Sequence, residues 1–151
     1  VPETAMMASA ASGLGLAQTY ALNGNGLDIN TAISGGYGSA HDIAVLAGAL
    51  AKKAPDIALA TTKPSATAVS QSGISFAVKN TDPVVLQVPG LLLSKTGYTD
   101  LAGGNLALVF EARLEHPIAV VVLGSTEDAR FTDGQALVAA TSGNFGGVSS
   151  L

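Results

Sequence analysis

Three runs rich in β-branched and apolar residues follow one another in the second half of the chain. They cover residues 91–99 (LLLSKTGYT), 105–113 (NLALVFEAR) and 117–125 (PIAVVVLGS). A short LEHP connection joins the second run to the third, and a DLAGGN turn separates the first two. This spacing predicts a three-stranded antiparallel meander.

Helices are predicted before and after this meander in the sequence. The clearest one begins after Ser39, with Asp42 three residues later as in a capping box. Apolar residues recur at helical spacing over positions 43–50, two lysines follow, and Pro55 is expected to end the helix. Helices before a sheet and a helix after it favour an α+β fold. Further helices are predicted over 2–12 and 126–141, loops over 23–40 and 61–73, an extended segment over 74–80, and a frayed tail from 142.

Length and composition indicate one domain with a real core. The chain has 151 residues, of which 48% are hydrophobic and only 12% charged, so it is neither disordered nor a coiled coil. Within this domain we expect helices and long loops in residues 1–80 and the sheet with its closing helix in residues 81–151. The longest apolar runs fall far below the ~20 residues of a spanning helix, so no membrane segment is predicted.

Charge and cysteine content exclude several kinds of site. The net charge is −4 and no basic cluster exceeds Lys52-Lys53, which argues against nucleic-acid binding. The absence of cysteine excludes disulfides, thiolate zinc sites and a cysteine nucleophile.

His41 and His116 lie far apart without metal-ligand spacing, so we expect solvated imidazoles, no metal site and no cofactor. We interpret the acidic residues as caps or solvated groups: Asp28, Asp42, Glu127 and Asp128.

The triplet Lys95-Thr96-Gly97, at the end of the first strand of the meander, is the strongest candidate binding motif. An ammonium and a hydroxyl next to each other can hold a carboxylate through charge-assisted hydrogen bonds. A glycine beside them lets a ligand backbone approach the strand. The alternative is a solvent-facing lysine with a threonine and a glycine that serve the turn. The glycine clusters at 34–39 and 102–105 do not match phosphate-binding loops, so turns are preferred there.

Residues 88–112 (VPGLLLSKTGYTDLAGGNLALVFEA) and 116–138 (HPIAVVVLGSTEDARFTDGQALV) closely resemble the serine D-alanyl-D-alanine carboxypeptidases. These are low-molecular-mass penicillin-binding proteins of the serine β-lactamase-like fold. The resemblance runs with little interruption from about residue 5 to residue 141. Three upstream segments also fit, namely 13–28 (a helix end and a Gly-Leu-Asp loop), 38–50 (a Ser-Thr-Ala-x-Asp helix) and 79–85 (an Asn-x-Asn segment).

The resemblance assigns roles to four residues. Lys95 and Thr96 are expected to bind the terminal carboxylate of a D-Ala-D-Ala peptide, or that of a β-lactam. Gly97 is expected to allow close approach, and the Tyr98 backbone N–H to act as one oxyanion donor. The family's Ser-x-x-Lys motif is missing, because no serine in the chain has a lysine three positions later. Residues 142–144 read Ser-Gly-Asn, but the family's Ser-x-Asn precedes Lys-Thr-Gly, so chance explains this match better.

The sequence therefore supplies one wall of the family's site and no nucleophile. The chain is expected to be the C-terminal part of the catalytic domain: a helical-lobe segment, the meander and a closing helix packed on the sheet. The first residue is Val rather than Met, so we expect that an N-terminal portion has been removed. Either that portion completes an acyl-transfer enzyme, or the chain is a non-catalytic carboxylate-binding or structural remnant.

Two further expectations follow from this interpretation. A sheet without its early strands exposes an edge, which predicts either a second polypeptide or self-association. By resemblance alone, the protein is expected outside the cytoplasm, on the periplasmic or cell-wall side. The preferred peptide and the oligomeric state stay open.

Overall fold

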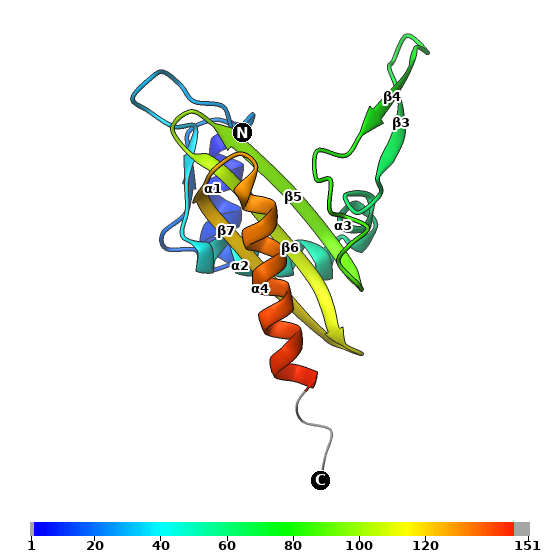
Figure 1. Cartoon of the computed structure of the whole chain (residues 1–151). Helices are drawn as coiled ribbons and strands as arrows, with labels where there is room; N and C mark the ends of the chain where they lie inside the picture. Colours follow the sequence, from blue (N-terminus) through cyan, green and yellow to red (C-terminus); the bar gives the residue numbers. More distant parts are fainter. Residues whose placement is uncertain (1, 147–151) are drawn as a thin grey trace.

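A three-stranded antiparallel sheet forms the centre of the computed structural model, which describes residues 2–146. The strands are β5 (Leu91–Thr99), β6 (Gly103–Arg113) and β7 (His116–Ser125), in the order β5-β6-β7. The predicted meander is therefore confirmed. Figure 1 shows helices on both faces of this sheet, so the central strand β6 is covered from both sides.

Helix α4 (Ala129–Gly146) packs on one face of the sheet and builds the larger part of the core. Gly134 lets this helix approach closely, since a Cβ there would come within 2.7 Å of Leu106 Cδ2. A helix was predicted over 126–141, whereas the observed helix begins at Ala129 and continues to Gly146. Residues 142–144 thus lie within a helix and not after it, whereas 147–151 of the predicted tail lie outside the described residues. The buried side chains of this core are Val88, Leu106, Leu108, Phe110, Val120 and Val138.

Helices α2 (Ala40–Lys53) and α3 (Pro55–Ala60) cover the opposite face. Half of the predicted capping box is confirmed, since the Ser39 hydroxyl accepts a hydrogen bond from the Asp42 N–H at 3.1 Å, whereas the Asp42 carboxylate bonds to residues 18 and 19. Pro55 both separates the two helices and starts the second one, because the first helical turn needs no proline N–H. The predicted apolar face of α2 is only partly buried here. The buried side chains on this side of the sheet are Ala47, Ala58, Leu93 and Val109.

The first forty residues contact α2 and the end of β5 through their loops and have little burial of their own. Helix α1 (Glu3–Gly13) occupies almost the predicted range and buries no side chain. The predicted loop that follows is interrupted by the pairing of β1 (Tyr20–Ala21) with β2 (Gly36–Tyr37). The rings of Tyr20 and Tyr37 stack across this pair with their centroids 5.1 Å apart.

A two-stranded hairpin stands away from the main sheet (Figure 1). It consists of β3 (Ser65–Val69) and β4 (Ser75–Lys79), and all ten residues are exposed. The prediction of an extended segment at β4 is confirmed, but the prediction of an irregular stretch over 61–73 was wrong for residues 65–69, which form β3. Four of the five residues of β3 are alanine, serine or threonine and only Val69 is bulky and apolar, so it lacks the long apolar run that marks the main sheet.

Candidate functional site

The Lys-Thr-Gly triplet lies on strand β5, at an edge of the sheet. On one side β5 pairs with β6, and no other strand among residues 2–146 pairs with its second side. In the pairing of β5 with β6, Lys95 is opposite Ala107, Thr96 opposite Leu106, and Gly97 opposite Asn105. The backbone of the triplet therefore borders an open edge at which an extended peptide can be added.

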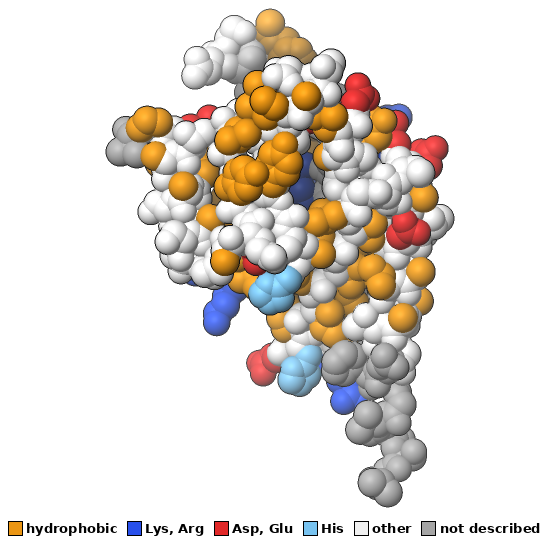
Figure 2. Space-filling model, turned by 90° about the vertical axis from the view of Figure 1, so that its left-hand side faces the viewer, with side chains coloured by type: hydrophobic (Ala, Val, Ile, Leu, Met, Phe, Trp, Pro, Cys, Tyr) orange, Lys and Arg blue, Asp and Glu red, His pale blue; other side chains and the backbone are white. Residues whose placement is uncertain are grey.

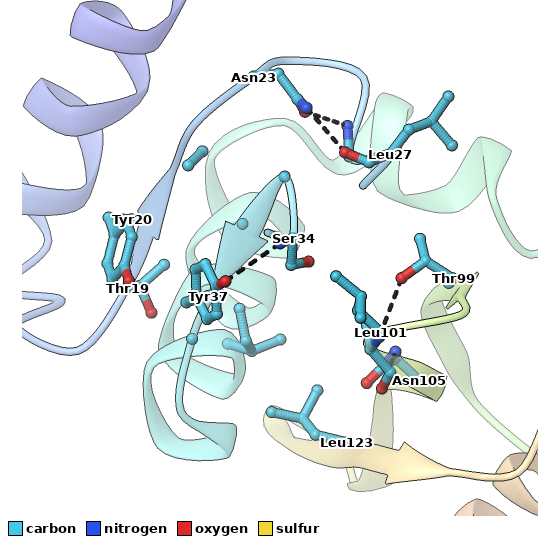
Figure 3. A pocket seen from close by; sticks show the side chains of 18 of the residues that line it. Thr19, Tyr20, Asn23, Leu27, Ser34, Tyr37, Thr99, Leu101, Asn105 and Leu123 are labelled. Carbon is cyan, nitrogen blue, oxygen red and sulfur yellow. Dashed lines mark hydrogen bonds between the residues drawn. The ribbon is translucent and has the colours of Figure 1, made fainter. Parts of the chain in front are cut away.

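A pocket of about 920 Å³ opens between this end of β5 and the loops of residues 19–38 (Figure 3). Lys95, Gly97 and Tyr98 line it together with Thr99, whereas Thr96 does not. Lys95 is the only charged residue among those lining the pocket, and among the described residues no carboxylate forms an ion pair with it. The pocket consequently presents one positive charge in mostly apolar surroundings, which suits an anionic ligand.

Lys95 and Thr96 occupy opposite faces of the strand, because side chains alternate along a β-strand. The Lys95 ammonium donates a hydrogen bond to the Thr96 carbonyl oxygen. The Thr96 hydroxyl lies 2.6 Å from the hydroxyl of Thr81, in the segment that follows β4. The two groups flank the same open edge from its two sides, so a ligand must lie along the edge to reach both.

Gly97 is not required by the packing of the chain itself. A Cβ at this position would meet only the Asn105 Cβ, at an ordinary 3.8 Å. The Gly97 carbonyl oxygen accepts a hydrogen bond from Arg130 Nη1 at 2.7 Å. The free space above Gly97 opens into the pocket, where it allows a ligand to approach the backbone.

Arg130 is a buried cation that the sequence analysis did not identify. It lies on α4, its residue is 7% exposed, and its guanidinium sits 4.7 Å from the centroid of the Phe131 ring. Its Nε has no hydrogen-bond partner among the described residues. No local motif marks this arginine, since Gly97 is 33 residues away in sequence. The guanidinium brings a second positive charge to the end of β5.

A buried network of hydrogen bonds anchors the part of β5 that directly precedes the triplet. The Asp82 carboxylate, in a residue 2% exposed, accepts hydrogen bonds from the Ser94 hydroxyl at 2.6 Å and from the Val84 N–H at 2.8 Å. Ser94 directly precedes Lys95, and its own N–H donates to the Thr61 hydroxyl at 2.9 Å. The network ties β5 to the segment after β4, and so fixes the strand position from which Lys95 and Thr96 project.

Asp28 joins the Gly-Leu-Asp loop to the end of β5. Its carboxylate accepts hydrogen bonds from the Thr99 hydroxyl at 3.0 Å and the Leu101 N–H at 3.2 Å. These bonds hold the loop against the end of β5, where both line the pocket.

Asp42 is buried, so its interpretation as a cap or solvated group was wrong. Ser39 provides the cap, and the Asp42 carboxylate accepts from the Gln18 N–H at 2.8 Å and the Thr19 hydroxyl at 3.0 Å. Burial raises the pKa of Asp42, while hydrogen bonds from Gln18, His41 and Thr19 lower it. The balance holds the pKa of this carboxyl below its ordinary value.

The histidines lie apart from the site. The His41 side chain is 83% exposed and its Nδ1 lies 3.4 Å from Asp42, while His116 is exposed at the start of β7. Between residues 2 and 146, His, Asp and Glu side chains form no group of three that could hold a metal ion.

Comparison with known proteins identifies the family. A family model described as D-alanyl-D-alanine carboxypeptidase, peptidase family S11, matches residues 4–127. The chain belongs to the D-alanyl-D-alanine carboxypeptidase family. No curated protein matches it. The predicted family is therefore confirmed from most of the chain, including β5 and the loops that line the pocket.

Solved structures of this family share the fold. A D-alanyl-D-alanine carboxypeptidase from Mycobacterium tuberculosis is 27% identical with a TM-score of 0.74, over 94% of this chain and 53% of that one. Penicillin-binding protein D2 from Listeria monocytogenes, solved with ampicillin bound, is 26% identical with a TM-score of 0.75, over 90% and 54%. The predicted α+β, β-lactamase-like fold is confirmed. The chain spans about half the length of these relatives.

Proposed function

We propose that this chain provides the carboxylate-binding wall of a serine-type D-Ala-D-Ala carboxypeptidase that also binds β-lactams. The observation that carries the proposal is the position of Lys95, the only charged residue lining a pocket beside an open strand edge, in a chain of this family. The substrate would be the D-Ala-D-Ala end of a peptidoglycan peptide. A cell-wall substrate implies a location outside the cytoplasm.

Each residue of the triplet has a distinct role in this proposal. The Lys95 ammonium and the Thr96 hydroxyl hold the terminal carboxylate through charge-assisted hydrogen bonds, while the substrate backbone runs along the open edge of β5. Gly97 leaves room for that backbone. The Tyr98 N–H donates to the oxygen on which negative charge develops during acyl transfer, where losing one donor typically slows a reaction by about 100–1000-fold.

The reaction further needs a nucleophile that these 151 residues do not contain in the family's Ser-x-x-Lys form. A serine activated by a neighbouring base attacks the D-Ala-D-Ala amide, D-alanine leaves, and water hydrolyses the acyl-enzyme. We propose that this serine comes from polypeptide outside these 151 residues. The alternative is a non-catalytic remnant that still binds carboxylates.

The apolar walls of the pocket support a covering polypeptide. Eight large apolar side chains that line the pocket are exposed, and clustered exposed apolar surface typically marks an interface. Figure 2 shows hydrophobic side chains gathered around a hollow in one face of the molecule. The partner is either the portion that completes the domain or a second copy that pairs with the edge of β5. These side chains are Met7, Tyr20, Leu27, Tyr37, Leu46, Tyr98, Leu101 and Leu123.

Intact-mass analysis after incubation with a penicillin tests the proposal. The 151-residue chain should gain no covalent adduct, whereas a protein that continues it with a Ser-x-x-Lys portion should gain the mass of one penicillin. Lys95→Ala should slow that acylation, while Lys53→Ala, at the exposed end of α2, serves as the matched lysine control. An adduct on the isolated chain would mean that the nucleophile lies within it, and no adduct on the longer protein would rule out the enzyme.

A further inference from the structure

The contact between the hydroxyls of Thr81 and Thr96 is short and connects two separate segments. The two oxygens lie 2.6 Å apart, although the residues are 15 positions apart in sequence. Thr96 lies on β5 beside Lys95, and Thr81 lies between β4 and β5. Neither the triplet nor the Asn-x-Asn resemblance assigns a role to Thr81.

The neighbours of Thr81 on both sides are anchored independently of it. The Asn80 side-chain amide donates to the Thr61 carbonyl oxygen at 2.7 Å and to the Lys63 carbonyl oxygen at 2.9 Å. On the other side, Asp82 is held by the Ser94 hydroxyl. The Thr81 hydroxyl is therefore not needed to attach this segment to β5, although it is held in place beside Thr96.

Proton counting gives the direction of the bond when a carboxylate is bound. Each hydroxyl carries one hydrogen and two acceptor lone pairs, whereas a carboxylate only accepts. If Thr96 donates its hydrogen to the ligand, the short bond requires Thr81 to donate to the Thr96 oxygen. Hydrogen bonds in such a chain polarise one another, so the donation from Thr81 strengthens the donation from Thr96 to the ligand.

We propose that Thr81 is a positioning residue that orients the Thr96 hydroxyl hydrogen toward the carboxylate of the bound peptide. This inference rests on the proposed function, because it presupposes that Thr96 binds that carboxylate. Without the Thr81 donor, the Thr96 hydroxyl rotates freely and spends part of its time directed away from the ligand. The consequence is weaker binding of the carboxylate with no loss of fold.

Two variants of Thr81 separate the hydroxyl from the shape of the side chain. Thr81→Val replaces the hydroxyl with a methyl group of similar size, and Thr81→Ser keeps the hydroxyl. N-acetyl-D-alanyl-D-alanine is titrated into the 151-residue chain, and its affinity is measured from the NMR shift of the Gly97 amide. We expect Thr81→Val to weaken binding about 3–10-fold, as for the loss of one hydrogen bond, and Thr81→Ser to bind like the unmodified chain.

A double-mutant comparison distinguishes this role from a purely structural one. In a Thr96→Val background, Thr81→Val should have no further effect, because the hydroxyl that it orients is already absent. The melting temperatures of the two Thr81 variants should match that of the unmodified chain. An equal loss of affinity in both backgrounds would overturn the proposal, since it would mean that Thr81 acts through the backbone.

Two other outcomes separate this proposal from the proposed function. If Thr96→Val and Lys95→Ala weaken binding while Thr81→Val does not, the positioning role is refuted and the carboxylate site stands. The C-terminal amide of the same dipeptide is the control ligand, since it lacks the carboxylate. If the unmodified chain binds the amide as well as the acid, the carboxylate site itself is refuted, and the role of Thr81 with it.

Discussion

Removing the buried carboxylate of Asp82 should strongly destabilise the fold. Asp82→Ala leaves two buried donors without an acceptor, namely the Ser94 hydroxyl at 2.6 Å and the Val84 N–H at 2.8 Å. An unsatisfied buried donor costs about 1–3 kcal/mol, so the two together predict a loss of about 2–6 kcal/mol. Typical domains have a total stability of about 5–15 kcal/mol, so the variant should be close to unfolding.

The pair of Asp82 and Ser94 should also show strong coupling. Ser94→Ala alone takes one donor from a buried carboxylate and should cost about 1–3 kcal/mol. In the Asp82→Ala background the same change removes a hydroxyl that has already lost its acceptor, so it should cost little or nothing. The double variant should therefore be about 1–3 kcal/mol more stable than the sum of the single variants predicts.

Urea unfolding followed by circular dichroism measures these energies, since the chain contains no tryptophan. The matched control is the pair of Ser125 and Asp133, where the serine hydroxyl also donates to the carboxylate at 2.6 Å, but at the surface. Its coupling should stay below about 1 kcal/mol because water can replace the lost partner. The burial argument fails if Asp82→Ala costs no more than Asp133→Ala.

Two further predictions concern the backbone and the response to acid. Gly97→Ala should be neutral or stabilise the chain by up to about 1 kcal/mol, since its Cβ meets nothing closer than 3.8 Å, yet it should weaken binding of N-acetyl-D-alanyl-D-alanine. Gly90→Ala is the contrast, because a φ of 68° and a Cβ 2.9 Å from the Glu111 carbonyl oxygen predict clear destabilisation in thermal melts. The lowered pKa of Asp42 means that its contribution to stability is present above the ordinary carboxyl pKa and is lost as the pH falls through the folded-state value. Asp42→Asn should therefore flatten the fall in melting temperature as the pH drops below the ordinary carboxyl pKa. An unchanged fall in melting temperature in acid would contradict this role of Asp42.

The sequence predicted the main sheet because its signal is local. Runs of apolar residues extend through β5, β6 and β7, and short turns join them, so neighbouring strands could be paired directly. The strand β3 was missed because its small residues, with Val69 as the single bulky apolar one, give no comparable run. The same composition predicted a loop, and only its pairing with β4 makes it a strand.

The site was predicted less completely than the fold, because its contacts are tertiary. The triplet identified β5, but strand alternation puts Lys95 and Thr96 on opposite faces, so that they flank the open edge from two sides. The bonds of Thr96 with Thr81 and of Gly97 with Arg130 join residues 15 and 33 positions apart. No spacing rule connects such residues before the chain is folded.

The hairpin of β3 and β4 has a mechanical consequence for the rest of the molecule. Its attachment to the body is concentrated at one end, where the Asn80 N–H bonds to the Pro64 carbonyl oxygen at 2.9 Å and its side chain holds Thr61 and Lys63. A two-stranded ribbon with every residue in solvent has little stability of its own. Its strands can separate and rejoin, or be cut by a protease, while the hydrogen bonds of Asn80 keep the neighbouring sheet undisturbed.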